Sequence, residues 1–345
     1  MQKIPYNEAI TWITQHVEGN PAGLTTTFAT HFGVSRMAAS TFVKQQVKAG
    51  YLRKSGSATR PHYALGDERR LFKTYHLPGA DEAEIWAKDF APYLDLPENI
   101  RNICHFGLTE MVNNANDHSL GHQLTLSVYQ GQGMLQIGVL DNGLGIFKKI
   151  ADALHLPDLK QALLELTKGK FTTDQKNHSG EGIFFTSRAF DFFSISANGL
   201  VFIHHDTHSN DHLHEEGPLV PAPHTGTGIA MQISLQSSRI LREVFNAYTS
   251  NLDELAFDKT VIPVRLARLG SDNLISRSQA KRLLQRVDKF RFVELDFSDV
   301  EEIGQAFADE VFRVFANQHP EVKLEATNTT PEVRRMINRA IKTER

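Results

Sequence analysis

The first 65 residues alternate between apolar and polar positions in a way that predicts three short helices and a hairpin. Apolar residues recur at helical spacing in each of the first three segments, and two strand-like runs then flank a polar turn. Ser35 is a suitable N-cap for the third helix, and Gly50 ends it. The predicted elements are helices at 8–17, 25–32 and 36–49 and strands at 51–54 and 61–65.

The middle of the chain combines one long helix with several strands. Residues 97–118 carry an apolar stripe at helical spacing, whereas the runs that follow alternate as strands do. The pattern predicts strands at 124–130, 134–140, 200–203 and 229–234 and a second helix at 183–189.

Residues 258–345 alternate between strand-like and helical patterns, which predicts a small parallel or mixed sheet covered by helices. The pattern as a whole predicts a multidomain α/β protein. Its expected domains lie at 1–66, 81–240 and 255–345, joined by a linker at 67–80.

The composition, 41% hydrophobic and 22% charged residues, is typical of a soluble globular protein. No apolar run approaches the roughly 18 to 20 residues that span a bilayer, and the first residues lack the apolar core of a signal peptide. The single cysteine, Cys104, excludes an internal disulfide. We therefore expect a cytoplasmic protein without a membrane partner.

The net charge of −3 hides an asymmetry. Residues 1–65 contain seven Lys and Arg against two Glu, a formal charge of +5, so that the remaining residues carry −8. A basic end on an acidic body predicts a nucleic-acid contact confined to that end.

Three helices followed by a hairpin resemble a winged helix-turn-helix domain. That resemblance implies that the third helix enters the major groove of DNA and that the hairpin touches phosphate. Arg36, Ser40 and Lys44 would then face DNA, with Lys54 and Arg60 on its backbone. The alternative is a protein-interaction or dimerisation module, since winged helices serve both purposes.

Candidate chemistry begins on the long helix. Glu110 and Asn114 lie four residues apart and therefore on one face, where a carboxylate and an amide can coordinate magnesium and orient water. Taken alone, they are better explained as a buried polar pair satisfied within the helix. Asp141 then ends a predicted strand and precedes Gly143 and Gly145, so that a carboxylate stands where backbone can approach a ligand.

A second glycine turn, Gly180 and Gly182, opens a predicted helix and offers backbone N–H groups to phosphate. Farther on, Thr227 leads into a strand. In this order the segments resemble the motif boxes of the GHKL ATPase superfamily over roughly residues 80–240, and most closely those of anti-sigma-factor kinases. The matching residues are Glu110, Asn114 and His118, then Asp141, Gly143 and Gly145, then Gly180 and Gly182, and finally Thr227.

The resemblance implies a Bergerat-type α/β sandwich that binds ATP and Mg²⁺. Asn114 would hold the metal, Asp141 would contact adenine, and Glu110 would be the general base. The segment between the glycine boxes would be an ATP lid, from which Lys168 and Lys170 would reach phosphate. The alternative, which explains lysines in such a segment better, is that both are solvated. Glu181 departs from the expected pattern because it puts an acid between the two glycines.

Residues 204–216 hold five histidines and four acids, which are potential zinc ligands. Their spacing matches no closed metal site, so we expect the His204–His214 segment to be a solvated loop. Near the C-terminus, 295–300 resembles the strand-end signature of STAS domains, the fold of anti-sigma-factor antagonists. The matching acceptor stretch, 303–307, contains no Ser or Thr, which favours a protein-interaction module over a phosphorylation substrate.

These patterns favour a nucleotide-switched, DNA-binding transcriptional regulator with slow ATP hydrolysis. One alternative is a serine/threonine kinase of the anti-sigma type, since a general base activates either water or a protein hydroxyl. Another is a partner-switching scaffold that binds ATP without turnover. The partners expected are DNA at the N-terminal domain, a protein at the STAS-like domain, and a second copy of the chain.

Overall fold

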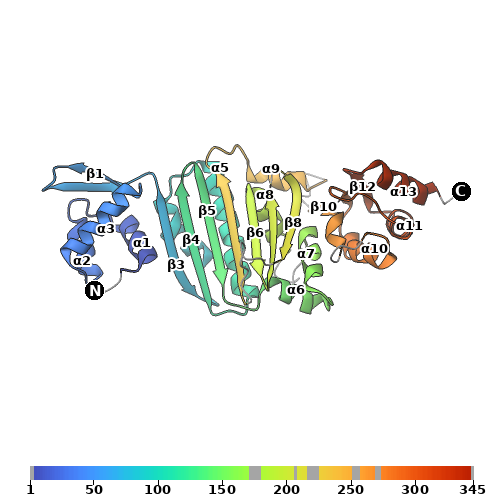
Figure 1. Cartoon of the computed structure of the whole chain (residues 1–345), viewed down its shortest axis with the longest axis horizontal. Helices are drawn as coiled ribbons and strands as arrows, with labels where there is room; N and C mark the ends of the chain where they lie inside the picture. The colour runs from blue at the N-terminus through green and yellow to red at the C-terminus, as the bar shows by residue number, and fades with distance from the viewer. Residues whose placement is uncertain are drawn as a thin grey trace. The chain divides into compact units, whose positions relative to one another are not determined.

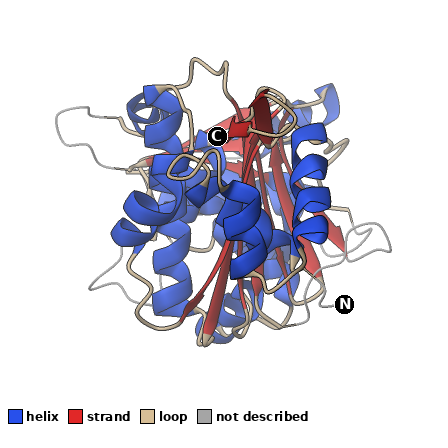
Figure 2. Cartoon of the chain, turned by 90° about the vertical axis from the view of Figure 1, so that its left-hand side faces the viewer, coloured by secondary structure: helices blue, strands red, loops and turns tan. Residues whose placement is uncertain are grey.

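A computed structural model describes residues 4–170, 180–205, 208–215, 225–250, 257–268 and 273–342. The chain mixes helices and strands throughout (Figure 2), as the α/β prediction requires. It divides into two compact units, the first made of residues 1–143 and 228–238 and the second of residues 144–227 and 239–345.

The first unit begins with the predicted helices and hairpin. Ser35 caps the third helix by accepting a hydrogen bond from the Ala38 N–H at 3.2 Å. The core of this module is aromatic, since the Phe28 ring stacks on Phe42 and meets Trp12 edge to face. The elements are α1 (Tyr6–His16), α2 (Leu24–His31), α3 (Arg36–Lys48), β1 (Leu52–Gly56) and β2 (Pro61–Leu65).

The expected linker at 67–80 is largely a strand. β3 (Arg69–His76) pairs antiparallel with β4 (Gln123–Gly131) along its whole length, so the prediction of a linker is wrong. The sequence hid this strand because only Leu71 in it is buried and its other positions are polar or partly exposed. Such a pattern is typical of a strand at the edge of a sheet.

Helix α1 covers the outer edge of β3. The hydroxyl of Thr11, which is 8% exposed, accepts a hydrogen bond from the Phe72 N–H at 2.8 Å. The same hydroxyl donates to the Phe72 carbonyl oxygen at 3.3 Å. One side chain therefore satisfies both backbone groups that this edge residue turns away from β4.

The sheet of the first unit continues in the order β3-β4-β5-β9 (Figure 1). β5 (Met134–Asp141) pairs antiparallel with β4 on one side and with β9 (Thr227–Ser234) on the other. The long helix α5 (Glu98–His118) packs against β5. The short helices before it are α4 (Glu82–Glu84), η1 (Ile85–Phe90) and η2 (Ala91–Tyr93).

Asn116 of α5 fixes the connection that follows β3. Its side-chain oxygen accepts hydrogen bonds from the backbone N–H groups of Gly79 and Ala80, both at 3.1 Å. Its amide nitrogen donates to the Ala80 carbonyl oxygen at 2.6 Å. The end of the expected linker is thus bound to the helix that carries the candidate site.

The second unit contains a three-strand antiparallel segment in the order β6-β7-β8. Residues 208–215 of the histidine-rich segment form β8, which pairs with β7, so the expectation of a loop is wrong there. His204 and His205 end β7, whereas residues 206, 207 and 216 and the side chains of 208–215 lie outside the described part. The elements are α6 (Ile146–Leu154), α7 (Leu159–Lys168), α8 (Gly182–Ala189), β6 (Phe192–Ala197), β7 (Leu200–His205), β8 (His208–Glu215) and α9 (Leu241–Ala247).

The C-terminal residues form a parallel sheet in the order β10-β11-β12, as the alternation predicts. Ser276 and Gln279 form a capping box that starts α10. The strands are β10 (Lys259–Pro263), β11 (Phe292–Asp296) and β12 (Lys323–Thr327), and the helices are η3 (Val264–Ala267), α10 (Arg277–Leu284), η4 (Val287–Lys289), α11 (Gln305–Asp309), η5 (Glu310–Phe315), α12 (Ala316–Gln318) and α13 (Pro331–Lys342).

Among the described residues, no helix is long and apolar enough to cross a membrane.

Replacing Thr11 with valine removes the hydroxyl that serves both edge groups of Phe72. Because the partly buried backbone N–H of Phe72 then loses this partner, we expect Thr11→Val to lower the free energy of unfolding by about 1 to 3 kcal/mol in urea titrations. Thr41→Val is the matched control, because the exposed Thr41 hydroxyl bonds only to Met37 within its own helix. Equal effects of the two substitutions would contradict the role of Thr11.

Candidate functional site

Helix α5 carries the first set of candidate residues at intervals of one turn. Glu110, Asn114 and His118 are all half-buried, and His118 is the last residue of the helix. The side-chain Nδ2 of Asn114 is buried and has no hydrogen-bond partner among the described residues. A buried polar atom without a partner costs free energy, so it indicates a position where a ligand or solvent completes the bonding.

Asp141 lies at the end of β5, the strand against which α5 packs. It is 7% exposed, and its Oδ1 accepts a hydrogen bond from the Gly143 N–H at 2.8 Å. This bond closes a tight turn directly after the strand. Position 143 must be glycine, because a Cβ there would stand 2.0 Å from the carbonyl oxygen of Ser119.

The neighbouring Asn142 holds the same turn to the start of β4. Its side-chain oxygen accepts hydrogen bonds from the backbone N–H groups of His122 and Gln123, both at 3.0 Å. The turn after β5 is therefore fixed by its own side chains, which keeps the Asp141 carboxylate in one place. A rigidly held carboxylate at a strand end suits recognition of a ligand's hydrogen-bond donor.

Gly145 and Thr227 lie in the second unit, where they set the beginning of α6. The hydroxyl of Thr227 accepts a hydrogen bond from the Ile146 N–H at 3.1 Å. Gly145 precedes the helix with a φ of +90°, and a Cβ there would stand 2.4 Å from the side chain of Asn198. Both candidate residues thus have a structural task in the fold, which is independent of any ligand.

Gly180 and Gly182 lie at the start of α8, the helix that the sequence places after the second glycine turn. Gly180 has a φ of +73°, and Gly182 is the first helical residue. Glu181, between them, is half-buried and makes no side-chain bond to cap the helix. Residues 171–179, the greater part of the expected ATP lid, lie outside the described residues.

Lys168 occupies a place that the sequence did not suggest. It is 1% exposed, and its ammonium donates to Glu165 Oε1 at 2.6 Å. It donates further to the carbonyl oxygens of Arg282 at 3.2 Å and Gln285 at 2.8 Å. All three ammonium hydrogens are used, so Lys168 has none left for a phosphate and is not the solvated lysine of the alternative interpretation.

Burial away from water lowers the pKa of Lys168, and the Glu165 carboxylate opposes that shift. Because its other two acceptors are carbonyls at the end of α10, Lys168 also provides a positive charge where a helix carries partial negative charge. We therefore assign Lys168 to the attachment between α7 and α10 instead of the nucleotide site.

The candidate DNA-contacting residues lie on the exposed parts of the N-terminal module. Arg36 and Lys44 are exposed on α3, with Ser40 half-buried between them. Lys54 on β1 and Arg60 in the hairpin turn are also exposed. Within the described chain, none of these four cations forms an ion pair. Positive charges without a partner are available for phosphate.

Sequence reasoning missed further residues on the same face of α3. Met37 is 80% exposed, and Thr41 and Lys48 are exposed as well. The helix buries its opposite side, which includes Phe42 and Val43. The signal was present in the helical spacing, because positions 37, 41, 44 and 48 fall on the side that faces away from the buried stripe.

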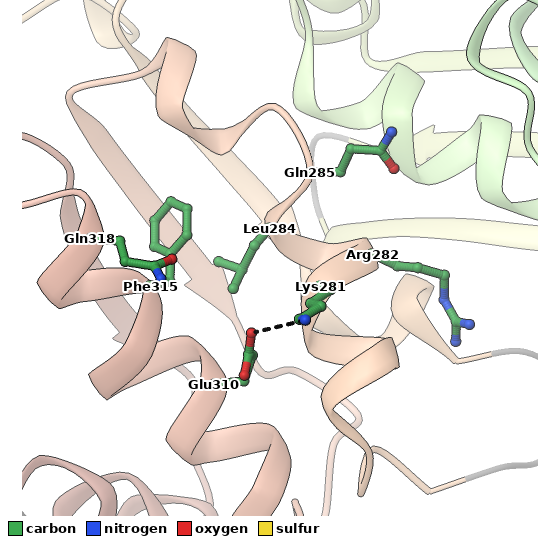
Figure 3. Close-up of a pocket in the computed structure, with 7 residues that line it drawn as sticks. All are labelled: Lys281, Arg282, Leu284, Gln285, Glu310, Phe315 and Gln318. Carbon is green, nitrogen blue, oxygen red and sulfur yellow. Dashed lines mark ion pairs between the residues drawn. The ribbon is translucent and has the colours of Figure 1, made fainter.

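A shallow cavity of about 380 Å³ lies on the C-terminal domain between α10 and the helices that follow β11 (Figure 3). Lys281 Nζ lies 4.0 Å from Glu310 Oε1 across this cavity, and Phe315 forms part of its apolar wall. Nearby, Asp296 is 2% exposed and accepts hydrogen bonds from the Ser298 N–H at 2.9 Å and from Asn328 Nδ2 at 2.8 Å. The end of β11 is thus tied to the end of β12.

Two comparisons with known proteins bear on these sites. A search of curated protein sequences gives no significant match. Residues 279–334 match the family model of a STAS-like domain of unknown function (DUF4325). This span runs from α10 to α13 and includes the strand end at 295–300 that carries the predicted STAS signature. The prediction of a STAS-like domain at the C-terminus is therefore confirmed.

Proposed function

We propose that this chain is an ATP- and magnesium-binding regulator of the GHKL type, in which the bound nucleotide controls DNA binding by a winged helix-turn-helix module. The observation that carries the nucleotide part is Asn114 Nδ2 on α5, one turn from Glu110, which is buried and has no hydrogen-bond partner among the described residues. As a donor it suits a phosphate oxygen, which leaves the amide oxygen of Asn114 for the metal. Asp141 adds a rigidly held, buried carboxylate at the end of the strand that α5 covers.

The donor set suits this cofactor. Carboxylate and amide oxygens are ligands that Mg²⁺ accepts, and magnesium usually binds with one or two such groups together with phosphate. Asn114 would hold the metal, which would neutralise charge on the phosphates, and Asp141 would accept a hydrogen bond from the adenine amino group. Gly180 and Gly182 would offer backbone N–H groups to the phosphates at the start of α8.

Glu110 is the residue that we assign to proton transfer. Its carboxylate lies one helical turn from Asn114, and a half-buried carboxylate can accept a proton from an attacking hydroxyl. Water as the acceptor gives an ATPase, whereas a protein hydroxyl gives a kinase. We favour water, because 303–307, where the STAS antagonists carry their acceptor, contains no Ser or Thr.

The DNA part rests on the exposed cations of the N-terminal module and on its attachment to the sheet. Arg36 and Lys44 lie on α3 without ion pairs inside the described chain. Through Thr11, α1 is bonded to β3, the edge strand of the sheet in which Asp141 ends strand β5. Because this contact is a direct hydrogen bond, a displacement of that sheet would be transmitted to the DNA-binding helices. The STAS-like domain would receive a protein partner.

Asp141→Asn tests the nucleotide site. The carboxylate of Asp141 accepts hydrogen bonds through both oxygens, whereas the amide of asparagine accepts through one atom and donates through the other. One position would therefore face the adenine amino group with a second donor. We expect affinity for a non-hydrolysable ATP analogue with magnesium to fall by at least about a hundredfold. Isothermal titration calorimetry measures this loss. Asp152→Asn is the matched control, because Asp152 is an exposed carboxylate that pairs only with Lys148 on α6.

Glu110→Gln distinguishes binding from turnover at the same site. This variant should bind the analogue as the unaltered chain does and release no phosphate from ATP. Retained analogue binding in Asp141→Asn would overturn the residue assignment. Labelled phosphate recovered on protein, and not as free phosphate, would assign a kinase in place of an ATPase.

Replacing Arg36 and Lys44 together with alanine tests the DNA interface. The double variant should bind a mixed-sequence DNA duplex about tenfold or more weakly, and the slope of log affinity against log salt should become shallower by about 2. Fluorescence anisotropy over a salt series gives both quantities. Lys148→Ala, which removes an exposed lysine from α6, should change neither. An unaltered slope in the double variant would mean that α3 serves another partner.

A further inference from the structure

The segments on either side of residues 171–179 are both attached to the C-terminal part of the second unit. Before residue 171, α7 ends at Lys168, whose ammonium bonds to two carbonyl oxygens near the end of α10. After it, α8 begins with Gly182, which belongs to the proposed phosphate-binding turn. The described contacts show how each of these two ends is held.

The first attachment is a buried charge cluster. Glu165 of α7 accepts from Lys168 at 2.6 Å through one oxygen and from Arg286 at 3.1 Å through the other. Glu165 and Lys168 are 2% and 1% exposed, whereas the Arg286 side chain is 15% exposed. Buried charges of this kind are stable only while each keeps its partners, so α7 and the end of α10 are bound to move together.

The backbone beyond α7 is held by the same domain. The Thr260 hydroxyl on β10 donates to the Lys168 carbonyl oxygen at 2.8 Å, and the Arg286 guanidinium donates to the Lys170 carbonyl oxygen. The Lys170 ammonium donates to the Lys289 carbonyl oxygen at 2.9 Å, and its Nζ lies 4.6 Å from the centre of the Phe290 ring.

The second attachment is an aromatic cluster centred on Phe257, which is 5% exposed. Its ring centre lies 4.6 Å from that of Phe184 and 4.9 Å from that of Phe185, both on α8. On the other side it lies 5.3 Å from Phe290, which precedes β11. Ring pairs at these separations are favourable beyond the apolar area that they bury. Phe257 thus joins α8 to the C-terminal domain.

We propose that the STAS-like domain regulates the proposed nucleotide site by positioning the Gly180–Gly182 turn, through the Glu165–Lys168–Arg286 cluster on one side and the Phe257 cluster on the other. The proposal rests on the nucleotide function proposed above. Lys168 and Phe257 are positioning residues, because Lys168 holds the end of α7, which packs against α8, and Phe257 packs on α8 itself, and neither is assigned a ligand contact. Any partner that shifts α10 changes nucleotide affinity, and nucleotide changes affinity for that partner by the same factor.

Lys168→Met tests the proposal in the full chain, because methionine fills similar space without the charge. Backbone hydrogen exchange of α8 should accelerate about tenfold while α3 and α5 exchange as before, since removing one member of a buried ion cluster opens the structure locally. The affinity for the ATP analogue with magnesium should fall by about the same factor. Lys148→Met, an exposed lysine on α6, is the matched control and should change neither quantity.

Phe257→Leu weakens the aromatic attachment and is tested by the same two measurements, α8 hydrogen exchange and affinity for the ATP analogue. It decides the question if Lys168→Met does not fold. Unchanged α8 exchange in a folded Lys168→Met or Phe257→Leu chain overturns the proposal. Faster α8 exchange with unchanged ATP affinity overturns it as well, because α8 would then be held by the domain without consequence for the ligand. If the unaltered chain binds no ATP analogue, the nucleotide function itself fails, and the exchange data still show whether the domain holds α8.

Discussion

An open sheet needs a cover for its edge, and in this protein one hydroxyl meets that need at Phe72 of β3. Thr11 serves the N–H and the carbonyl of Phe72, which face away from β4. Without a partner both groups would either remain in water or attract another strand. The contact also joins the N-terminal helices to the sheet that carries Asp141, so a structural necessity becomes a physical connection between two candidate sites.

The second unit depends on an analogous constraint, in which the group that needs partners is a buried charged side chain and not a backbone group. Lys168 is fully buried, and only the combination of Glu165 with two carbonyls of the α10 end makes that burial tolerable. A chain that needed only to hold α7 in place would be served equally well by apolar side chains. The polar arrangement specifies one geometry between α7 and the C-terminal domain, and a specified geometry is what regulation requires.

Much of the fold was predictable because its elements have strong local patterns. The apolar stripe of α5, the N-cap at Ser35 and the strand–helix alternation after residue 258 all predict what the structure contains. β3 was missed because an edge strand buries few side chains, and Leu71 alone does not make a recognisable alternation. β8 was missed for a related reason, since its residues are almost entirely polar.

The candidate site was predictable only in its residues and not in their surroundings. Spacing placed Glu110 and Asn114 on one face of a helix, and Asp141 at a strand end, as they are found. Spacing cannot show that Lys168 meets carbonyls more than a hundred residues away, because that contact is fixed by tertiary packing. Nor does it show that position 143 needs glycine because the carbonyl oxygen of Ser119 leaves no room for a Cβ, with or without a ligand nearby.

We propose that nucleotide binding and DNA binding are coupled in this chain. The most direct test is the affinity for a mixed-sequence DNA duplex, measured by fluorescence anisotropy at fixed salt with and without magnesium and a non-hydrolysable ATP analogue. We expect a change of at least about fivefold in the unaltered chain and none in Asp141→Asn. Equal DNA affinity in the two nucleotide states, with the analogue shown to be bound, would contradict it.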